Sequence, residues 1–157
     1  MIIREPVTEP TAVTLEPVPT AVVRHRGVTV ADLPALFDAA YPAIGASGAA
    51  IAGPAFAVYR GDPSARFDLE IGFPVTSPVA GPIAGPVTVE PSELPVGPSL
   101  TLSHLGSYDA LHEGWGRLAG EAAAQGLVPR CFFEVYVTEP TPDTDPATLR
   151  TDLYLMV

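Results

Sequence analysis

The sequence predicts an α+β fold built from two β-α-β-β units, because a pattern of strands and one helix occurs twice along the chain. In the first copy a strand ends at His25-Arg26-Gly27, and in the second a strand ends at His104-Leu105-Gly106, 79 residues later. Two further matches join Phe56-Ala57-Val58-Tyr59 to Phe133-Glu134-Val135-Tyr136 and Asp68-Leu69-Glu70-Ile71 to Asp152-Leu153-Tyr154-Leu155. Matches in the same order indicate a duplicated supersecondary unit. We expect an antiparallel sheet with two helices on one face and a central cleft between the halves.

Length and composition favour a single folded domain. The chain has 157 residues, and 47% of them are hydrophobic while 17% are charged, a balance typical of globular proteins. A chain of this size buries roughly two-thirds of its unfolded surface. We therefore predict one domain over residues 1–157, with pseudo-repeats at about 19–75 and 99–157.

The first repeat is expected to contain a strand, a helix and two strands. Thr29 is a suitable N-cap, and Asp32 lies in the first turn, near the positive end of the helix dipole. Apolar residues spaced by three and four then predict one buried helical stripe. Gly61-Asp62-Pro63-Ser64 is a turn sequence that separates the last two strands. The expected elements are a strand at 21–25, a helix over 30–44, and strands at 55–60 and 66–75.

Residues 76–99 contain nine prolines and glycines and are expected to connect the repeats, with a short strand around 87–90. In the second repeat Ser107 caps a helix, and Gly126 stands where a C-terminal stop is expected. Three glycines inside that helix are either small packing residues or points where a strand or ligand approaches closely: Gly114, Gly116 and Gly120. The expected elements are a strand at 99–103, a helix from 108 to about 125, and strands at 131–138 and 151–156.

The alternation of side chains along the strands sorts them into two faces. We expect the wholly apolar sets to face the helices, namely Phe133, Val135 and Val137; Leu153, Leu155 and Val157; and Leu69, Ile71 and Phe73. The remaining sets are expected to reach one concave surface, and they contain Glu134, Tyr136, Tyr154, Glu70 and Tyr59.

Charge and composition exclude several classes of protein. The formal net charge is −10, and no basic cluster extends beyond Arg24-His25-Arg26, which argues against a nucleic-acid-binding face. A lone Cys131 gives neither an internal disulfide nor a metal cluster, and no cofactor motif is present. The sequence has no signal peptide and no apolar run long enough to span a membrane. The expectation is a soluble, cytoplasmic protein without metal or cofactor.

Glu134 is the main candidate for chemistry, because the other repeat has Ala57 at the matching position. The fold alone does not require a carboxylate at a position where the other repeat has alanine. Glu134 is either a solvated residue on an exposed face or a partly buried carboxylate with Phe132 and Tyr136 on either side. In the second case it suits a planar or cationic ligand. Trp115 is either a core residue of its helix or a wall of the same pocket.

The two histidines at the strand ends, His25 and His104, occupy matching positions in the repeats. A structural hydrogen bond near the following glycine turn is the favoured interpretation, with catalysis as the alternative. No local spacing supports a Ser-His-Asp triad.

These features resemble the GyrI-like family of small-molecule-binding domains, which have a SOUL-like fold and are related to effector-binding domains of AraC-type and MerR-type multidrug regulators. The resemblance rests on the duplicated unit, on Leu-Gly-Ser-Tyr-Asp-Ala-Leu at 105–111 and on Phe-Phe-Glu-Val-Tyr at 132–136. In regulators of this family a strand glutamate and a pocket residue two positions later hold cationic drugs among aromatic rings. Glu134 and Tyr136 match that pattern, and Tyr154 matches an aromatic on the following strand. The segment before Pro19 is too short and too proline-rich for DNA-binding helices.

The favoured function is a stand-alone binder of small aromatic or cationic molecules that acts in sequestration or resistance. The resemblance also implies an enzyme alternative, in which Glu134 is the catalytic base of a hydrolase that opens cyclopropane-bearing toxins. A gyrase-interacting inhibitor is the third candidate. The expected ligand-binding residues are Tyr136, Tyr154, Trp115, Phe132, Tyr59, Tyr108 and Glu70.

Overall fold

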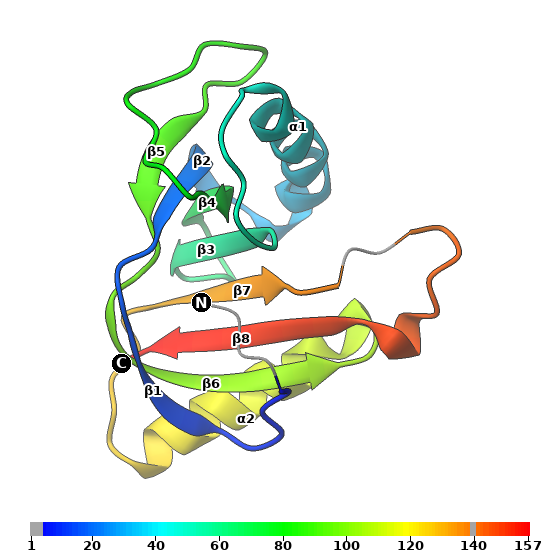
Figure 1. Cartoon of the computed structure of the whole chain (residues 1–157). Coiled ribbons are helices and arrows are strands. Elements are labelled where there is room, and N and C mark those ends of the chain that lie inside the picture. The colour runs from blue at the N-terminus through cyan, green and yellow to red at the C-terminus, as the bar shows by residue number, and fades with distance from the viewer. Residues whose placement is uncertain (1–4, 139–140) are drawn as a thin grey trace. The chain divides into compact units, whose positions relative to one another are not determined.

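The computed structural model describes residues 5–138 and 141–157, which form two compact units (Figure 1). One unit runs from Pro17 to Pro95, and the other combines residues up to Glu16 with Val96–Val157. Each unit contains antiparallel strands and one α-helix, so the predicted α+β class is confirmed. No helix in the described part of the chain is long and apolar enough to cross a membrane.

In the unit of residues 17–95 the strands lie in the order β3-β4-β2-β5, and every neighbouring pair is antiparallel. Strands β3 and β4 are adjacent, as the sequence predicts for residues 55–75. Helix α1 packs on β2 and β4, where the Tyr41 ring contacts the Phe73 ring at a centroid distance of 5.5 Å. The bounds are β2 (Pro19–Val28), α1 (Leu33–Ala46), β3 (Phe56–Gly61), β4 (Phe67–Pro74) and β5 (Glu90–Glu93).

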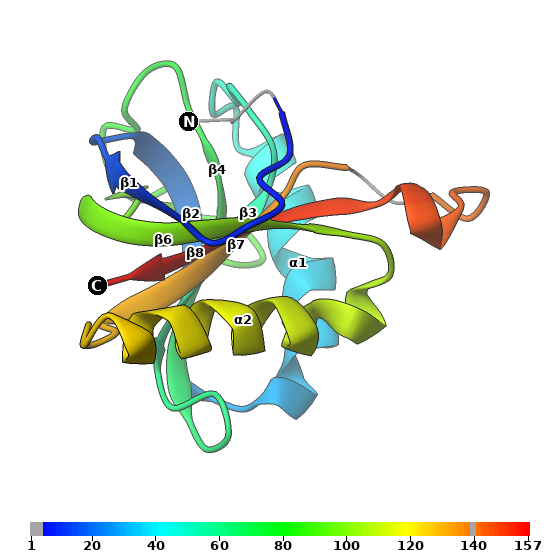
Figure 2. The ribbon, with the colours of Figure 1, turned by 90° about the horizontal axis from the view of Figure 1, so that it is seen from below.

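In the other unit the strands lie in the order β1-β6-β8-β7, again antiparallel, and α2 covers one face of them (Figure 2). The Ser107 side chain accepts a hydrogen bond from the Asp109 amide at the start of this helical segment, and Gly126 has a φ of +69° just beyond its end. The bounds are β1 (Thr11–Leu15), β6 (Gly97–Leu105), α2 (Leu111–Ala124), β7 (Cys131–Tyr136) and β8 (Arg150–Met156), with a 3-10 turn at Tyr108–Ala110 before α2.

The core between α2 and its strands is built from small and branched side chains. Gly114 belongs to this contact, because a Cβ at that position would lie 2.7 Å from Leu153 Cδ1. A Cβ on Gly116 or Gly120 would meet nothing within 4 Å. Close packing therefore explains the first glycine and not the other two. The buried core residues are Leu100, Leu102, Leu118, Ala122, Leu153 and Leu155.

Two strands lie outside the predicted repeats. Strand β1 was not expected from the proline-rich N-terminal segment, yet it pairs with β6. The short strand expected at 87–90 is displaced to Glu90–Glu93, where it pairs with β2. Each unit thus gains its fourth strand from a segment that has no counterpart in the other repeat.

The predicted assignment of faces is wrong for β7. Glu134 lies opposite Leu153 on β8, and Leu153 packs under α2, so Phe132, Glu134 and Tyr136 point to the helix side. Phe133 lies opposite Tyr154 on the other face. The error has a physical reason: both faces are buried here, so a wholly apolar set does not identify the one that a helix covers.

The register also separates two residues of the unit 17–95. Tyr59 lies opposite Leu69, whereas Glu70 lies opposite Val58. Since neighbours along a strand alternate, Tyr59 and Glu70 are on opposite faces, and their predicted common surface is wrong. The cleft predicted between the halves stays a prediction.

Candidate functional site

Glu134 lies on β7, on the face that α2 covers, and only 8% of it is exposed. The solvated interpretation is therefore wrong. A carboxylate removed from water this far needs hydrogen-bond donors to remain stable. Two neighbouring side chains supply them.

The indole of Trp115 donates from Nε1 to Glu134 Oε2 at 2.9 Å, and the Tyr136 hydroxyl donates to Oε1 at 2.9 Å. One donor comes from α2 and the other from the same strand, two positions later. The Trp115 ring packs at the margin of the core, and its N–H orients the carboxylate, while its role as a pocket wall stays a prediction.

Aromatic rings lie on both sides of this carboxylate. Trp115 meets Phe132 edge-to-face at a centroid distance of 4.8 Å, and Tyr136 meets Tyr108 edge-to-face at 6.1 Å. Tyr108 is 37% exposed and forms the solvent-facing rim of the group. Burial, and secondarily the negative charge of Glu134, raise the pKa of Tyr108. We call Glu134, Trp115, Tyr136, Phe132 and Tyr108 the Glu134 cluster.

Tyr154 is not part of the Glu134 cluster. It lies on the opposite face of β8, stacked on Phe133 with ring centroids 4.6 Å apart. Burial first, and then the charge of Asp152, raise its pKa to about 12. The prediction that Tyr154 shares a surface with Glu134 is wrong, because direct strand pairing sets it opposite Phe133 rather than Glu134.

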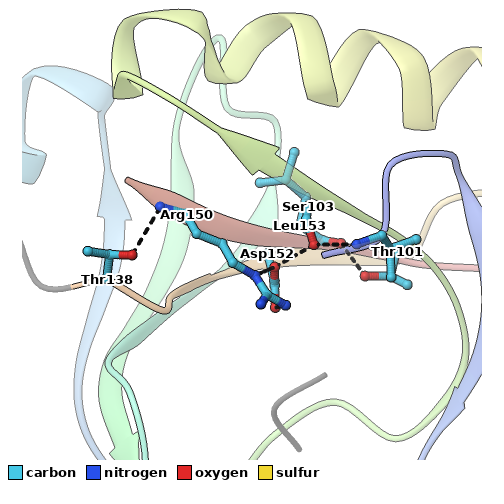
Figure 3. Close-up of polar contacts among 7 residues, drawn as sticks. Thr101, Ser103, Thr138, Arg150, Asp152 and Leu153 are labelled. Carbon is cyan, nitrogen blue, oxygen red and sulfur yellow. Dashed lines mark hydrogen bonds and ion pairs between the residues drawn. The ribbon is translucent and has the colours of Figure 1, made fainter. Parts of the chain in front are cut away.

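A buried polar network that sequence reasoning missed lies on that same face (Figure 3). Asp152, 1% exposed, accepts hydrogen bonds from Ser103 Oγ at 2.7 Å and from Arg150 Nε at 2.9 Å. Arg150 Nη2 donates to the second carboxylate oxygen at 3.0 Å, so the pair is bidentate. The sequence feature that could have predicted this network is an arginine and an aspartate two positions apart on one strand, Arg150 and Asp152. The closed geometry indicates a structural ion pair.

Glu70 belongs to a second charged group, in the unit of residues 17–95. It accepts hydrogen bonds from Arg24 Nε at 2.9 Å and from Ser92 Oγ at 2.7 Å, and Arg60 Nη2 lies 3.8 Å away. An open hollow of about 320 Å³ lies over this group. Tyr59 is buried on the other face against Phe67, so it does not reach the hollow. The lining residues are Arg24, His25, Arg26, Val58, Arg60, Asp68, Leu69, Glu70 and Ser92.

The strand registers support the match between Glu134 and Ala57. Ala57 lies opposite Ile71 and Glu134 lies opposite Leu153, in each case on the helix-covered face. The same registers make Glu70 the counterpart of Asp152. The sequence comparison matches Asp68 with Asp152, so the structural match is shifted by two residues along β4.

The histidines differ from one another. His104 Nε2 lies 2.8 Å from the Ser107 carbonyl oxygen across the Gly106 turn, which confirms the structural interpretation for this residue. His25 lines the hollow beside Arg24, and burial lowers its pKa. Residues 5–138 and 141–157 contain no group of three or more His, Cys, Asp or Glu side chains placed to hold a metal ion.

Over residues 8–157 the sequence matches the family described as the GyrI-like small molecule binding domain. The chain belongs to the GyrI-like family. This match extends over both compact units.

Solved structures of similar fold agree with this assignment. The C-terminal domain of EcmrR has a TM-score of 0.76 at 17% identity, with 94% of this chain and 96% of that chain covered. The chain spans 56% of the longer EcmrR chain solved in a complex with DNA. SAV2435, solved bound to tetraphenylphosphonium, has a TM-score of 0.69 at 10% identity, covering 94% of this chain and 93% of that chain. A hydrolase from Listeria innocua has a TM-score of 0.64 at 13% identity, with 97% and 93% covered. No curated protein matches the sequence.

Proposed function

We propose that this GyrI-like chain binds small aromatic cations at the Glu134 cluster. The observation that carries the proposal is the nearly buried carboxylate of Glu134, which the Trp115 indole and the Tyr136 hydroxyl hold in place between two pairs of rings. Both of these donors are neutral groups, so their hydrogen bonds orient the carboxylate without bringing a positive charge to it.

The Glu134 cluster suits both the aromatic rings and the positive charge of such a ligand. Ring faces attract cations, more strongly when water is excluded, and they also stack with flat apolar surfaces. The carboxylate adds attraction for positive charge and none for a neutral or anionic molecule. Tyr108, as the partly exposed rim, marks the side from which a ligand reaches the cluster.

The comparisons support the ligand class. A protein of the same fold, SAV2435, was solved with tetraphenylphosphonium, which is an aromatic cation. We infer that this chain uses the same class of ligand, in a sequestering or resistance role.

Binding of tetraphenylphosphonium and of tetraphenylborate tests the charge role, because the two ions share a shape and differ in sign. Wild type is expected to bind the phosphonium and to discriminate against the borate. Glu134→Gln should weaken phosphonium binding by roughly 2–5 kcal/mol, the range for losing a desolvated charge partner. Isothermal titration calorimetry measures both ions on both proteins.

Glu113→Gln is the matched control. Glu113 is an exposed residue of α2, so this variant has the same change in net charge without touching the cluster. Phosphonium affinity should stay within a factor of about two. An equal loss in both variants would assign the effect to net charge, and an unchanged affinity in Glu134→Gln would remove Glu134 from the site.

The second candidate function is hydrolysis, in which the same Glu134 carboxylate serves as a general base that activates water. The Listeria innocua hydrolase shares the fold, and binding and turnover both fit a residue held in this geometry. Kinetics separate the two, as set out in the Discussion.

A further inference from the structure

One hydroxyl beside the Glu134 cluster has no hydrogen-bond partner among the described residues. Thr151 on β8 is 0% exposed, and its Oγ1 neither donates nor accepts a hydrogen bond. Native proteins pair the large majority of buried polar atoms, so an unpaired hydroxyl requires an explanation.

Thr151 lies on the face that α2 covers, next to the carboxylate. It pairs directly with Tyr136 on one side and with His104 on the other. Glu134 is therefore its diagonal neighbour across β7 and β8. The backbones at such diagonal positions are about 7–8 Å apart, and the Cβ atoms are somewhat closer.

The duplicated unit shows what the fold alone requires at this position. In the other repeat the residue that pairs with Tyr59 and with His25 is Leu69, which is buried and apolar. Thr151 has the same two kinds of neighbour, a tyrosine and a histidine. Leucine thus satisfies the packing, and the hydroxyl is an addition in one copy only.

Two apolar positions of the first repeat become polar in the second, and they are neighbours. Ala57 corresponds to Glu134, and Leu69 corresponds to Thr151. We propose that Thr151 Oγ1 is a specificity-determining contact of the Glu134 cluster, which accepts a hydrogen bond from an N–H group of the bound cation. The inference rests on the proposed function and names its ligand class more narrowly.

The favoured ligand is an aromatic amidinium or primary ammonium ion. The Glu134 carboxylate attracts positive charge and has lone pairs for a further donor besides Trp115 and Tyr136, and the Thr151 hydroxyl accepts another N–H. Hydrogen bonds of about 2.9 Å on both sides let one planar cation with several N–H groups join the carboxylate to the hydroxyl. A quaternary cation has no N–H, so it uses the rings and Glu134 alone.

Thr151→Val tests this directly, because valine keeps the shape of threonine and removes the oxygen. Benzamidinium and phenyltrimethylammonium serve as the two probes, both small aromatic cations. Benzamidinium affinity is expected to fall by about 10-fold or more, as for loss of a hydrogen bond to a charged group. Phenyltrimethylammonium affinity should change less than twofold.

The melting temperature of the ligand-free variant gives an independent readout. Removing an unsatisfied buried hydroxyl should raise it by about 2–4 °C for a chain of this length. Thr20→Val is the matched control, since Thr20 is also buried with an unpaired Oγ1 but belongs to the unit of residues 17–95. It should raise the melting temperature without changing the affinity for either probe.

The outcomes separate this inference from the proposed function. An equal effect of Thr151→Val on both probes, no effect on either, or a lowered melting temperature overturns the role of Thr151. If Glu134→Gln still weakens both probes in that case, the proposed function stands. If wild type binds neither probe nor tetraphenylphosphonium, both proposals fail together.

Discussion

Tyr154 combines burial with a nearby negative charge, and this makes stability depend on alkaline pH. Its pKa is about 12 in the folded chain, against an ordinary value of 10.0. Between these values the unfolded chain loses the proton first, so stability is fully present below about pH 10 and is lost as the pH rises toward 12. Two pKa units correspond to roughly 2–3 kcal/mol. Urea unfolding at pH 8, 10 and 11 measures the loss.

Tyr154→Phe should flatten this dependence, because phenylalanine keeps the stacking on Phe133 and has no proton to lose. A smaller decrease should remain from Tyr108, whose pKa is also raised. An unchanged slope in Tyr154→Phe would mean that other groups control the alkaline loss.

The residues of the Glu134 cluster could be predicted from the sequence where the signal was local. Phe132, Glu134 and Tyr136 alternate on one strand, so their shared face follows from strand geometry. Which face of the sheet these three side chains share could not be predicted, because it depends on the register between β7 and β8, which sets Glu134 opposite Leu153 and Phe133 opposite Tyr154. Single-residue shifts of register exchange faces, and no sequence pattern here distinguishes two buried faces.

At the level of elements, α2 contains glycines of two kinds, and alanine substitutions should separate them. Gly116→Ala or Gly120→Ala meets open space, so each should stabilise the chain by about 1 kcal/mol through helix propensity. Gly114→Ala places a methyl group 2.7 Å from Leu153 Cδ1 in the core, and overpacking of about 1–3 kcal/mol outweighs that gain. Thermal denaturation of the three variants measures the difference. A stabilising Gly114→Ala would show that Leu153 moves aside freely.

The helices and the six strands of the repeats could be predicted because each has its own periodicity and turn residues. Strand β1 could not, because its five residues, in the segment between Pro10 and Pro17, have no distinct pattern. Its strand conformation depends on pairing with β6, which lies far away in the sequence. Such tertiary effects override local propensity most easily in short edge strands.

For the whole molecule, the duplicated architecture predicts a single site. Only one repeat has a glutamate at the position where the other has Ala57, so one aromatic cation should bind per chain. Calorimetry with tetraphenylphosphonium should give a stoichiometry near one, and Glu134→Gln should weaken binding at that one site. Two equivalent sites that both survive in Glu134→Gln would contradict this prediction.

Turnover is a separate property of the molecule. A cyclopropane-bearing toxin mixed with a tenth of its molar amount of protein should remain mostly intact if the chain only binds it. Complete conversion would indicate an enzyme, and in that case Glu134→Ala should lower the rate by at least about 10²-fold, the scale for removing a general base. Mass spectrometry of the toxin over time distinguishes the two outcomes.

Strand β1 also has a consequence for how the chain folds during synthesis. Residues 17–95 form a unit that is contiguous in sequence, whereas β1 must pair with β6, which is made only after that unit is complete. Segments made first generally fold first on the ribosome. Residues 17–95 are therefore complete before β1 has a partner. During that interval residues 11–15 have no strand to pair with, and this is the period in which a chaperone or a second nascent chain has access to them.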